Sequence, residues 1–450
     1  MRGRLGVLAA ATAVVIGAGY LTWSPPARPS EGDGRSRSRG HAAVIDHQEL
    51  QRLIGAYEGR VRARPNAADY AFLAQLYLQR GRGTGDVGTY LQAEQAVTAA
   101  LALAPTDSGA RVLLGSVRYT THDFPAALDL ARQVLTENPD QVGALGLAGD
   151  AQLELGAYTE AAQAYAKVAA SSPDAPAIEV RQARLAFIQG HVEQARRLAA
   201  KAEGDAKASA LGGVDLAYYE AFHGQVELDV GHYAMAAQFY KEALEEAPGY
   251  YVALAGLART RAVQGRVGEA IGLYEKTVAT LPQPDFVAAL GDLYTLAGDT
   301  AKANLEYGTV EVIATLARIN RQIYNRQLAL FDADHGVRLD EGVRLADTEL
   351  SVRKDVYGYD ADAWALYKIG RYAEARAAAE KAMAQGTRDA RILYHAGLID
   401  QALGHPAAAM AELRQALAIS PNFDPLQAPR ARAALARLIR QGKGKEAATR

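Results

Sequence analysis

The chain has 450 residues, more than one compact core usually organises, so the sequence predicts either several domains or an elongated array. Its 49 basic and 51 acidic residues give a formal net charge of -2, which offers no overall attraction for nucleic acid. The absence of cysteine excludes disulfides, thiolate metal sites and cysteine nucleophiles. Alanine is abundant, and Val and Ile do not alternate with polar residues, so we expect an all-α protein.

The amino-terminal segment joins a basic start to an uncharged run. Arg2 and Arg4 precede the uncharged residues Leu5 to Trp23, which would extend roughly 28 Å as a helix, close to the thickness of a bilayer core of about 30 Å. A secretory signal has the same features. Residues 1–23 are therefore predicted to be either an uncleaved membrane anchor, which Trp23 favours, or a cleaved signal. Both alternatives place the body outside the cytoplasm, membrane-anchored or secreted.

The remaining chain divides by composition. Residues 24–43 are rich in Pro, Gly, Ser and charge, so they are predicted to form a flexible linker. A folded array is expected over 44–424, followed by a capping helix at 425–441 and a disordered tail at 442–450. The high alanine content and the excess of Arg over Lys favour a bacterial source.

A unit of 34 residues recurs along the array, as residues 108–141 and 142–175 illustrate. A small residue such as Gly149 lets two paired helices approach to about 8 Å. A glycine can end the first helix of a unit in the left-handed conformation, at Gly156, Gly190, Gly231, Gly265, Gly298, Gly370 and Gly404. A proline ends the second helix, at Pro139, Pro173, Pro248, Pro282 and Pro421.

Two stretches depart from this unit. The sequence RGRGTGDVG at residues 80–88 is expected to enlarge the turn between the two helices of the first full unit. Residues 300–356 contain no proline, and they predict a degenerate helix pair.

These landmarks resemble the tetratricopeptide repeat over most of residues 50–423. The resemblance implies a right-handed α-solenoid superhelix of about nine helix-turn-helix repeats, whose first helices form a concave groove for protein partners. The family's groove positions fall on Tyr119, Arg184, Phe187, Tyr218, Arg259, Trp364, Tyr367 and Tyr394. Trp364 is the leading candidate; if its ring faces the groove, its replacement by Ala should spare folding.

Other constellations are excluded by their residues. The Lys, Asn and Arg clamp with which some family members hold chaperone tails is not reproduced at the groove positions. The nine histidines form no metal signature, and no phosphate loop or nucleophile elbow occurs. We therefore expect no catalytic residues, no metal site and no cofactor.

Three functions remain open. The first is a non-enzymatic scaffold, exported or membrane-tethered, that binds a peptide or partner helix in its concave groove. The second is a carrier of a polysaccharide or lipid in cell-envelope export, served by the groove aromatics. The third is a cytosolic regulatory adaptor. The sequence does not distinguish the partner, the process or the oligomeric state.

Overall fold

The computed structural model describes residues 47–319 and 324–448. Within these ranges the chain forms 22 helices and no strand, so the predicted all-α class is confirmed. The helices are α1 (His47–Ala63), α2 (Ala67–Thr84), α3 (Val87–Leu103), α4 (Ser108–Thr120), α5 (Phe124–Glu137), α6 (Val142–Glu154), α7 (Tyr158–Ser171), α8 (Pro176–Ile188), α9 (Val192–Ala208), α10 (Gly213–Asp229), α11 (Tyr233–Glu246), α12 (Tyr251–Val263), α13 (Val267–Thr280), α14 (Pro284–Leu296), α15 (Thr300–Ile319), α16 (Asn325–His335), α17 (Leu339–Val352), α18 (Val356–Lys368), α19 (Tyr372–Met383), α20 (Ala390–Leu403), α21 (Pro406–Ile419) and α22 (Gln427–Ala448).

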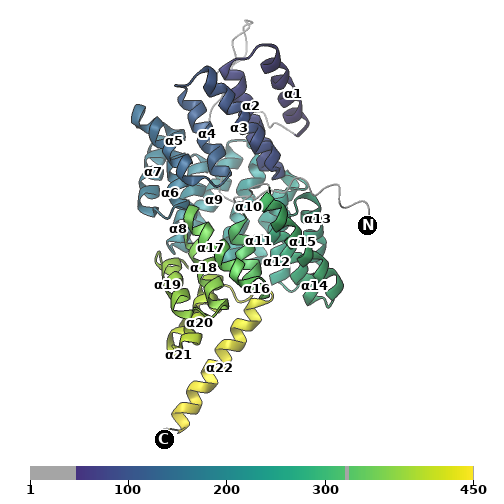
Figure 1. Cartoon of the computed structure of the whole chain (residues 1–450), viewed down its shortest axis with the longest axis vertical. Helices are drawn as coiled ribbons and strands as arrows, with labels where there is room; N and C mark the ends of the chain where they lie inside the picture. Colours follow the sequence, from purple (N-terminus) through teal and green to yellow (C-terminus); the bar gives the residue numbers. More distant parts are fainter. Residues whose placement is uncertain (1–46, 320–323, 449–450) are drawn as a thin grey trace.

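The helices from α2 to α21 form ten antiparallel pairs, each packed against the next (Figure 1). Helix α1 precedes the first pair and α22 follows the last one. This is the predicted repeat solenoid, with ten pairs where about nine were expected. The seven turn glycines all have positive φ values, as predicted: Gly156, Gly190, Gly231, Gly265, Gly298, Gly370 and Gly404.

The predicted signal or anchor at 1–23 and the linker at 24–43 lie outside the described residues. In the part of the chain that is described, no helix combines the length and the hydropathy needed to cross a bilayer. The predicted degenerate pair is confirmed, because α16 and α17 pack together within residues 300–356.

The expected enlarged turn at residues 80–88 is wrong. Helix α2 continues to Thr84 and α3 begins at Val87, so the extra residues lengthen both helices. Gly81 lies within α2 and packs closely against α3, since a Cβ at this position would lie 2.5 Å from the ring of Tyr90. Close packing at this position therefore outweighs the low helix propensity of glycine, which destabilises a helix by about 1 kcal/mol relative to Ala.

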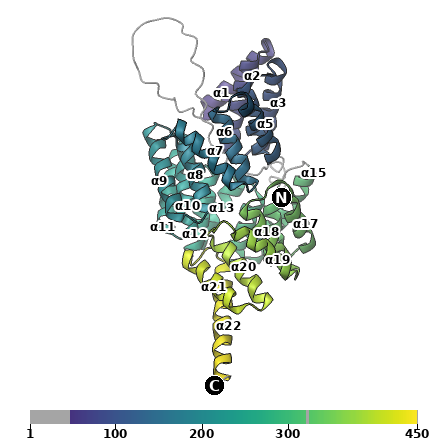
Figure 2. The same ribbon diagram turned by 90° about the vertical axis from the view of Figure 1, so that its left-hand side faces the viewer.

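The C-terminal cap also extends further than expected. A cap was predicted at 425–441 with a disordered tail from 442, whereas α22 runs from Gln427 to Ala448 and projects from the body (Figures 1 and 2). Its buried residues are Gln427, Ala428, Ala431, Ala434 and Leu438, among those whose side chains the structure describes. Its two late glycines lower helix propensity, by about 1 kcal/mol each relative to Ala, without ending the helix.

The superhelix is wound so tightly that successive turns touch. In four pairs, the turn between the two helices contacts another stretch of the chain. That stretch lies at the end of the pair that comes five pairs later in the sequence. The contacts join Gly85 to Leu281, Gly156 to Lys354, Gly190 to Gly386 and Gly231 to Ile419. We call this set the inter-turn seam, comprising Gly85, 154–158, 188–190 and 231–233 on one side, and Leu281, 353–356, 386–387 and 419–422 on the other.

Hydrogen bonds accompany these contacts along the seam. The hydroxyl of Thr387 donates to the carbonyl oxygen of Ile188 at 2.5 Å. The backbone N–H of Asn422 donates to the hydroxyl of Tyr233 at 3.0 Å. In Figure 1, α17 to α19 accordingly lie beside α6 to α8, although these helices are far apart in sequence.

Replacing Gly149 by leucine should lower the free energy of unfolding by about 1–3 kcal/mol, measured by urea denaturation. A Cβ on Gly149 would already lie 2.5 Å from the buried ring of Tyr165, so α6 and α7 would have to separate. The matched control is Gly268→Leu, since Gly268 is exposed on α13 with open space around its Cα. Equal losses in the two variants would contradict overpacking as the cause.

Candidate functional site

The eight predicted groove residues divide evenly by exposure. Tyr119, Phe187, Trp364 and Tyr394 are buried, whereas Arg184, Tyr218, Arg259 and Tyr367 are partly exposed. In this conformation the four buried side chains cannot contact a partner. They contribute to the packing between helices.

Trp364 is a core residue, and the expectation that its ring faces an open groove is wrong. The side chain is 2% exposed, and its Nε1 donates a hydrogen bond of 2.8 Å to Asp334 on α16. Gln427 of α22 donates to the same carboxylate oxygen at 2.7 Å. Tyr367 stacks on the indole at a centroid distance of 5.0 Å, and His395 stacks at 4.1 Å. The inner faces of α16, α18 and α20 are close enough to enclose the ring.

The remaining predicted residues have separate surroundings. Tyr394 packs against Phe423 beyond α21, with ring centroids 5.5 Å apart. Arg259 forms an ion pair of 3.4 Å with Asp229, and its side chain is 38% exposed. Of the two predicted groove arginines, Arg259 is the more exposed, because the Arg184 side chain is only 19% exposed.

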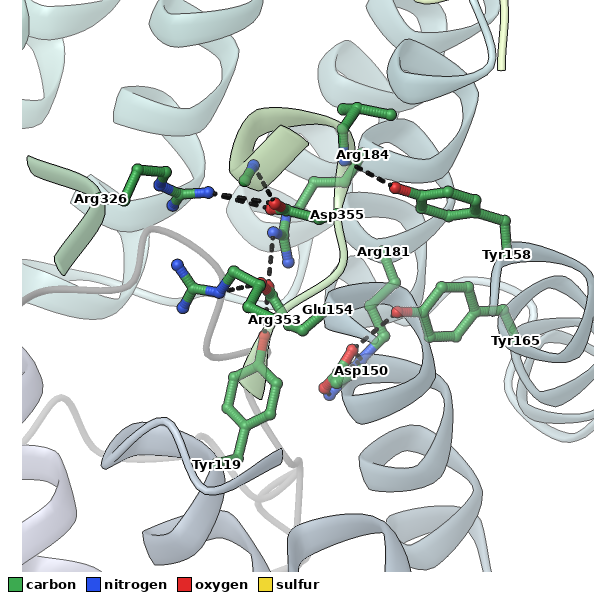
Figure 3. Close-up of polar contacts among 12 residues, drawn as sticks. Tyr119, Asp150, Glu154, Tyr158, Tyr165, Arg181, Arg184, Arg326, Arg353 and Asp355 are labelled. Atoms are coloured by element: carbon green, nitrogen blue, oxygen red, sulfur yellow. Dashed lines mark hydrogen bonds and ion pairs between the residues drawn. The ribbon is translucent and has the colours of Figure 1, made fainter. Parts of the chain in front are cut away.

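Two predicted groove residues meet at a carboxylate that is not among the predicted groove residues. The hydroxyl of Tyr119 on α4 donates to Glu154 Oε1 at 3.1 Å. Arg184 Nη2 on α8 donates to the same oxygen, also at 3.1 Å. Glu154 itself is the last residue of α6 (Figure 3). Side chains from three successive repeats therefore converge on one buried acidic group.

A second ion pair lies one helical turn before Glu154 on α6, at Asp150. Arg181 on α8 binds Asp150 through two nitrogens, with Nε to Oδ1 and Nη2 to Oδ2 both at 2.8 Å. Tyr165 on α7 donates to Asp150 Oδ1 at 3.0 Å. Both charged side chains are 5% exposed. This bidentate pair satisfies the buried charges within the first turn of the superhelix.

The next turn of the superhelix adds Arg353, which follows α17. Its Nε lies 3.0 Å from Glu154 Oε2, and its Nη1 lies 3.2 Å from Glu349 Oε1. Its guanidinium also lies 4.8 Å from the ring centroid of Phe124 on α5. Beside it, Arg326 is 3.0 Å from Asp355 (Figure 3). The seam at this level is thus a buried network of paired charges.

The network shifts the pKa values of its members. Burial alone would raise the pKa of Glu154, but the guanidinium groups of Arg353 and Arg184 outweigh burial and hold it below its usual range. Burial raises the pKa of Glu349. Burial, reinforced by the charge of Arg353, lowers the pKa of His122 to about 3. The pKa values of the two carboxylates beside Arg353 are thus shifted in opposite directions, and His122 is neutral at pH 7.

His122 should make the protein less stable as the pH falls from 6.5 towards 3. Its Nε2 is buried without a hydrogen-bond partner among the described residues. The unfolded chain binds a proton below pH 6.5, whereas the folded chain does not until about pH 3. Wild-type stability relative to His122→Asn should therefore drop by about 2 kcal/mol between pH 7.5 and pH 5.

Urea denaturation at the two pH values checks this expectation. Asparagine suits the comparison because His122 has a φ of 63°, a conformation that asparagine tolerates. A stability difference that stays constant with pH would show that His122 does not titrate as argued.

Two groups of acidic side chains have the spacing of cation ligands. They are Asp174, Glu179 and Asp205, and Glu203, Glu220 and Glu242. In the first group the ammonium of Lys201 contacts all three carboxylates. In the second, Lys207 lies 2.6, 3.2 and 3.5 Å from them. A lysine thus supplies the positive charge in each group.

Comparisons with known proteins identify the repeat. Models of the tetratricopeptide repeat match residues 78–141, 112–176, 227–293 and 390–423. No curated protein matches the chain.

The chain is similar to several solved structures, each at low sequence identity. A human IFIT1 dimer with PPP-AAAA is 14% identical, with 84% of this chain and 95% of that chain covered and a TM-score of 0.42. Yeast Tom70 is 12% identical, with 87% and 93% covered and a TM-score of 0.34. A tetratricopeptide repeat protein from Parabacteroides merdae is 16% identical, with 61% and 100% covered and a TM-score of 0.39.

Proposed function

The chain is a tetratricopeptide-repeat protein, and we propose that it is a non-enzymatic scaffold that binds a peptide or helix of a protein partner on its concave face. The observation that carries the proposal is the row of partly exposed side chains Arg184, Tyr218 and Arg259 on α8, α10 and α12. These side chains come from the inner helices of three successive repeats, the arrangement through which a solenoid presents a continuous recognition surface.

The partly exposed groove residues extend this surface. Tyr218 and Arg259 lie on α10 and α12, so the partly exposed side chains continue beyond α8 into the next two repeats. Tyrosine and arginine are frequent anchors at protein interfaces because each combines apolar area with directional hydrogen bonds. A partner that crosses these repeats would contact several of them together.

We further propose that the scaffold is exported, either membrane-anchored or secreted, through its residues 1–23. The support is the sequence alone, namely the basic start and the uncharged run up to Trp23. Fractionation of cells that express the full chain tests this proposal. Recovery of the body in the cytosol would overturn export and favour the regulatory adaptor.

The alternative of a polysaccharide or lipid carrier was based on groove aromatics. Trp364 and Tyr394 are buried, so they offer no stacking surface in this conformation. The structure therefore favours the protein partner over this ligand class.

Site-specific photocrosslinking tests the scaffold. A photoreactive amino acid replaces Arg259 on the inner helix α12 of the full chain, and a matched variant carries it at Gln238, which is exposed on the outer helix α11. We expect a discrete protein adduct at position 259 that is absent at position 238. Adducts at neither position, or the same adducts at both, would contradict binding on the concave face.

A further inference from the structure

The segment between α17 and α18 lies on the α6–α7 turn in the manner of a bound peptide. Arg353 has an extended backbone, with φ of -137° and ψ of 118°. The N–H of Lys354 donates to the carbonyl oxygen of Glu154 at 3.0 Å. The N–H of Val356 donates to the hydroxyl of Tyr158 at 3.0 Å. Two backbone donors of the segment therefore bind acceptors on the first turn of the superhelix.

The turn is shaped to accept a backbone at close range. Gly156 has a φ of 77°, and a Cβ at this position would lie 2.5 Å from the carbonyl oxygen of Lys354. Any larger residue at position 156 would push the segment away. The glycine thus serves both the end of α6 and the approach of another stretch of chain.

Arg353 is the side-chain anchor of the segment. Its side chain is 4% exposed and reaches Glu154 and the ring of Phe124, both on the first turn. Glu154 Oε1 is taken by Tyr119 and Arg184, so Arg353 pairs with the remaining oxygen, Oε2. A buried carboxylate with one oxygen left for a cation selects an arginine or lysine, and the planar guanidinium also suits an aromatic face.

The same backbone recognition recurs elsewhere on the seam without this anchor. Tyr233 begins α11 as Tyr158 begins α7, and its hydroxyl accepts the N–H of Asn422 at 3.0 Å. The tyrosine hydroxyl is therefore a repeated acceptor for extended chain. Among the seam levels described above, the one at Glu154 adds a buried charge pair, which makes it specific for one kind of side chain.

We propose that the α6–α7 turn, with Glu154 and Phe124, is a binding site for an extended peptide segment carrying an arginine, and that Arg353 occupies it in cis. The site deepens the proposed scaffold function, because Glu154 is also where the groove residues converge. A partner segment with an arginine in extended backbone would replace the residues around 353 and open the seam at this level. Its apparent affinity is reduced by the fraction of molecules in which the site is already filled.

The test weakens the internal occupant of the full chain and supplies it as a peptide. Arg353→Lys keeps the positive charge next to Glu154 but loses the planar fork, which reduces the advantage of the cis segment. The probe is a fluorescein-labelled peptide of residues 351–358, SVRKDVYG, and the control peptide has glutamine in place of its arginine. Fluorescence anisotropy should show at least about tenfold tighter binding of the arginine peptide to Arg353→Lys than to wild type.

Matched variants make the result specific. Arg371→Lys is the control variant, because Arg371 is an exposed arginine directly before α19. It should leave peptide binding at the wild-type level. Adding Glu154→Gln to Arg353→Lys should abolish the preference for the arginine peptide. Equal binding of both peptides to a folded Arg353→Lys chain, or binding of neither, would overturn the proposal.

Amide hydrogen exchange of the wild-type chain provides a measurement that does not depend on a variant. Excess arginine peptide should speed exchange at Lys354 and Val356, and the glutamine peptide should not. Unchanged exchange with the arginine peptide would also overturn the proposal. Neither outcome bears on the crosslinking at position 259, so failure of this site is distinguishable from failure of the scaffold function.

Discussion

Replacing Arg181 by methionine is expected to lower the free energy of unfolding by about 3–5 kcal/mol. The substitution leaves Asp150 buried at 5% exposure, with the Tyr165 hydroxyl as its remaining side-chain hydrogen-bond donor among the described residues. A carboxylate that has lost its counter-ion in a low-dielectric interior is far less stable than the intact pair. The loss arises from the orphaned charge, since the methionine fills much of the space of the arginine stem.

Urea denaturation followed by circular dichroism measures the effect. The control adds Asp150→Asn, which removes the buried charge and leaves an amide that can still accept from Tyr165. The double variant should recover part of the stability that Arg181→Met loses. A loss below about 1 kcal/mol in the single variant, the range of an exposed ion pair, would show that the pair is solvated.

Replacing Trp364 by alanine should cost about 3–5 kcal/mol, the range for truncating a large buried aromatic residue. The ring lies between Tyr367 and His395, and its N–H satisfies a carboxylate on α16 that also binds α22. Truncation would leave a cavity and remove a donor from Asp334. If the Trp364 ring instead faced an open groove and bound a partner, its removal would have little effect on the free energy of unfolding.

Thermal denaturation of the full chain distinguishes these cases. Trp364→Phe, which retains most of the apolar contact but lacks the N–H, should lie between wild type and alanine. Tyr372→Ala is a matched surface control, because Tyr372 is 38% exposed at the start of α19. Equal melting temperatures for Trp364→Ala and the wild type would show that Trp364 does not contribute to the core.

The repeat could be predicted because its determinants are local. A small residue where paired helices cross, a glycine after the first helix and a proline after the second are each required within one unit of 34 residues. The same local reasoning failed at residues 80–88, where four glycines indicate a loop. Helix contacts with Tyr90 decide the conformation there, and a propensity cannot anticipate a contact between helices.

The candidate site could be predicted only in part. Tyr119 and Arg184 were expected at the groove, but Glu154 was not, and Arg353 belongs to a loop of another turn. Their meeting depends on the pitch of the superhelix, which is the accumulated result of small rotations at every repeat interface. Periodicity in the sequence reports that repeats stack; it does not report the pitch, so it could not reveal that Trp364 is enclosed.

The seam also fixes the number of repeats in the protein. In an open solenoid each repeat touches its neighbours alone, so gaining or losing one unit shortens or lengthens the array and changes little else. Here four turn glycines each meet a segment five pairs further along, and one added or deleted pair between them would displace each of these contacts by a whole unit. Duplication or loss of a repeat, the ordinary route by which such arrays diverge, would disrupt several levels together. The array therefore has a fixed length, and its ends are expected to unfold cooperatively with its middle.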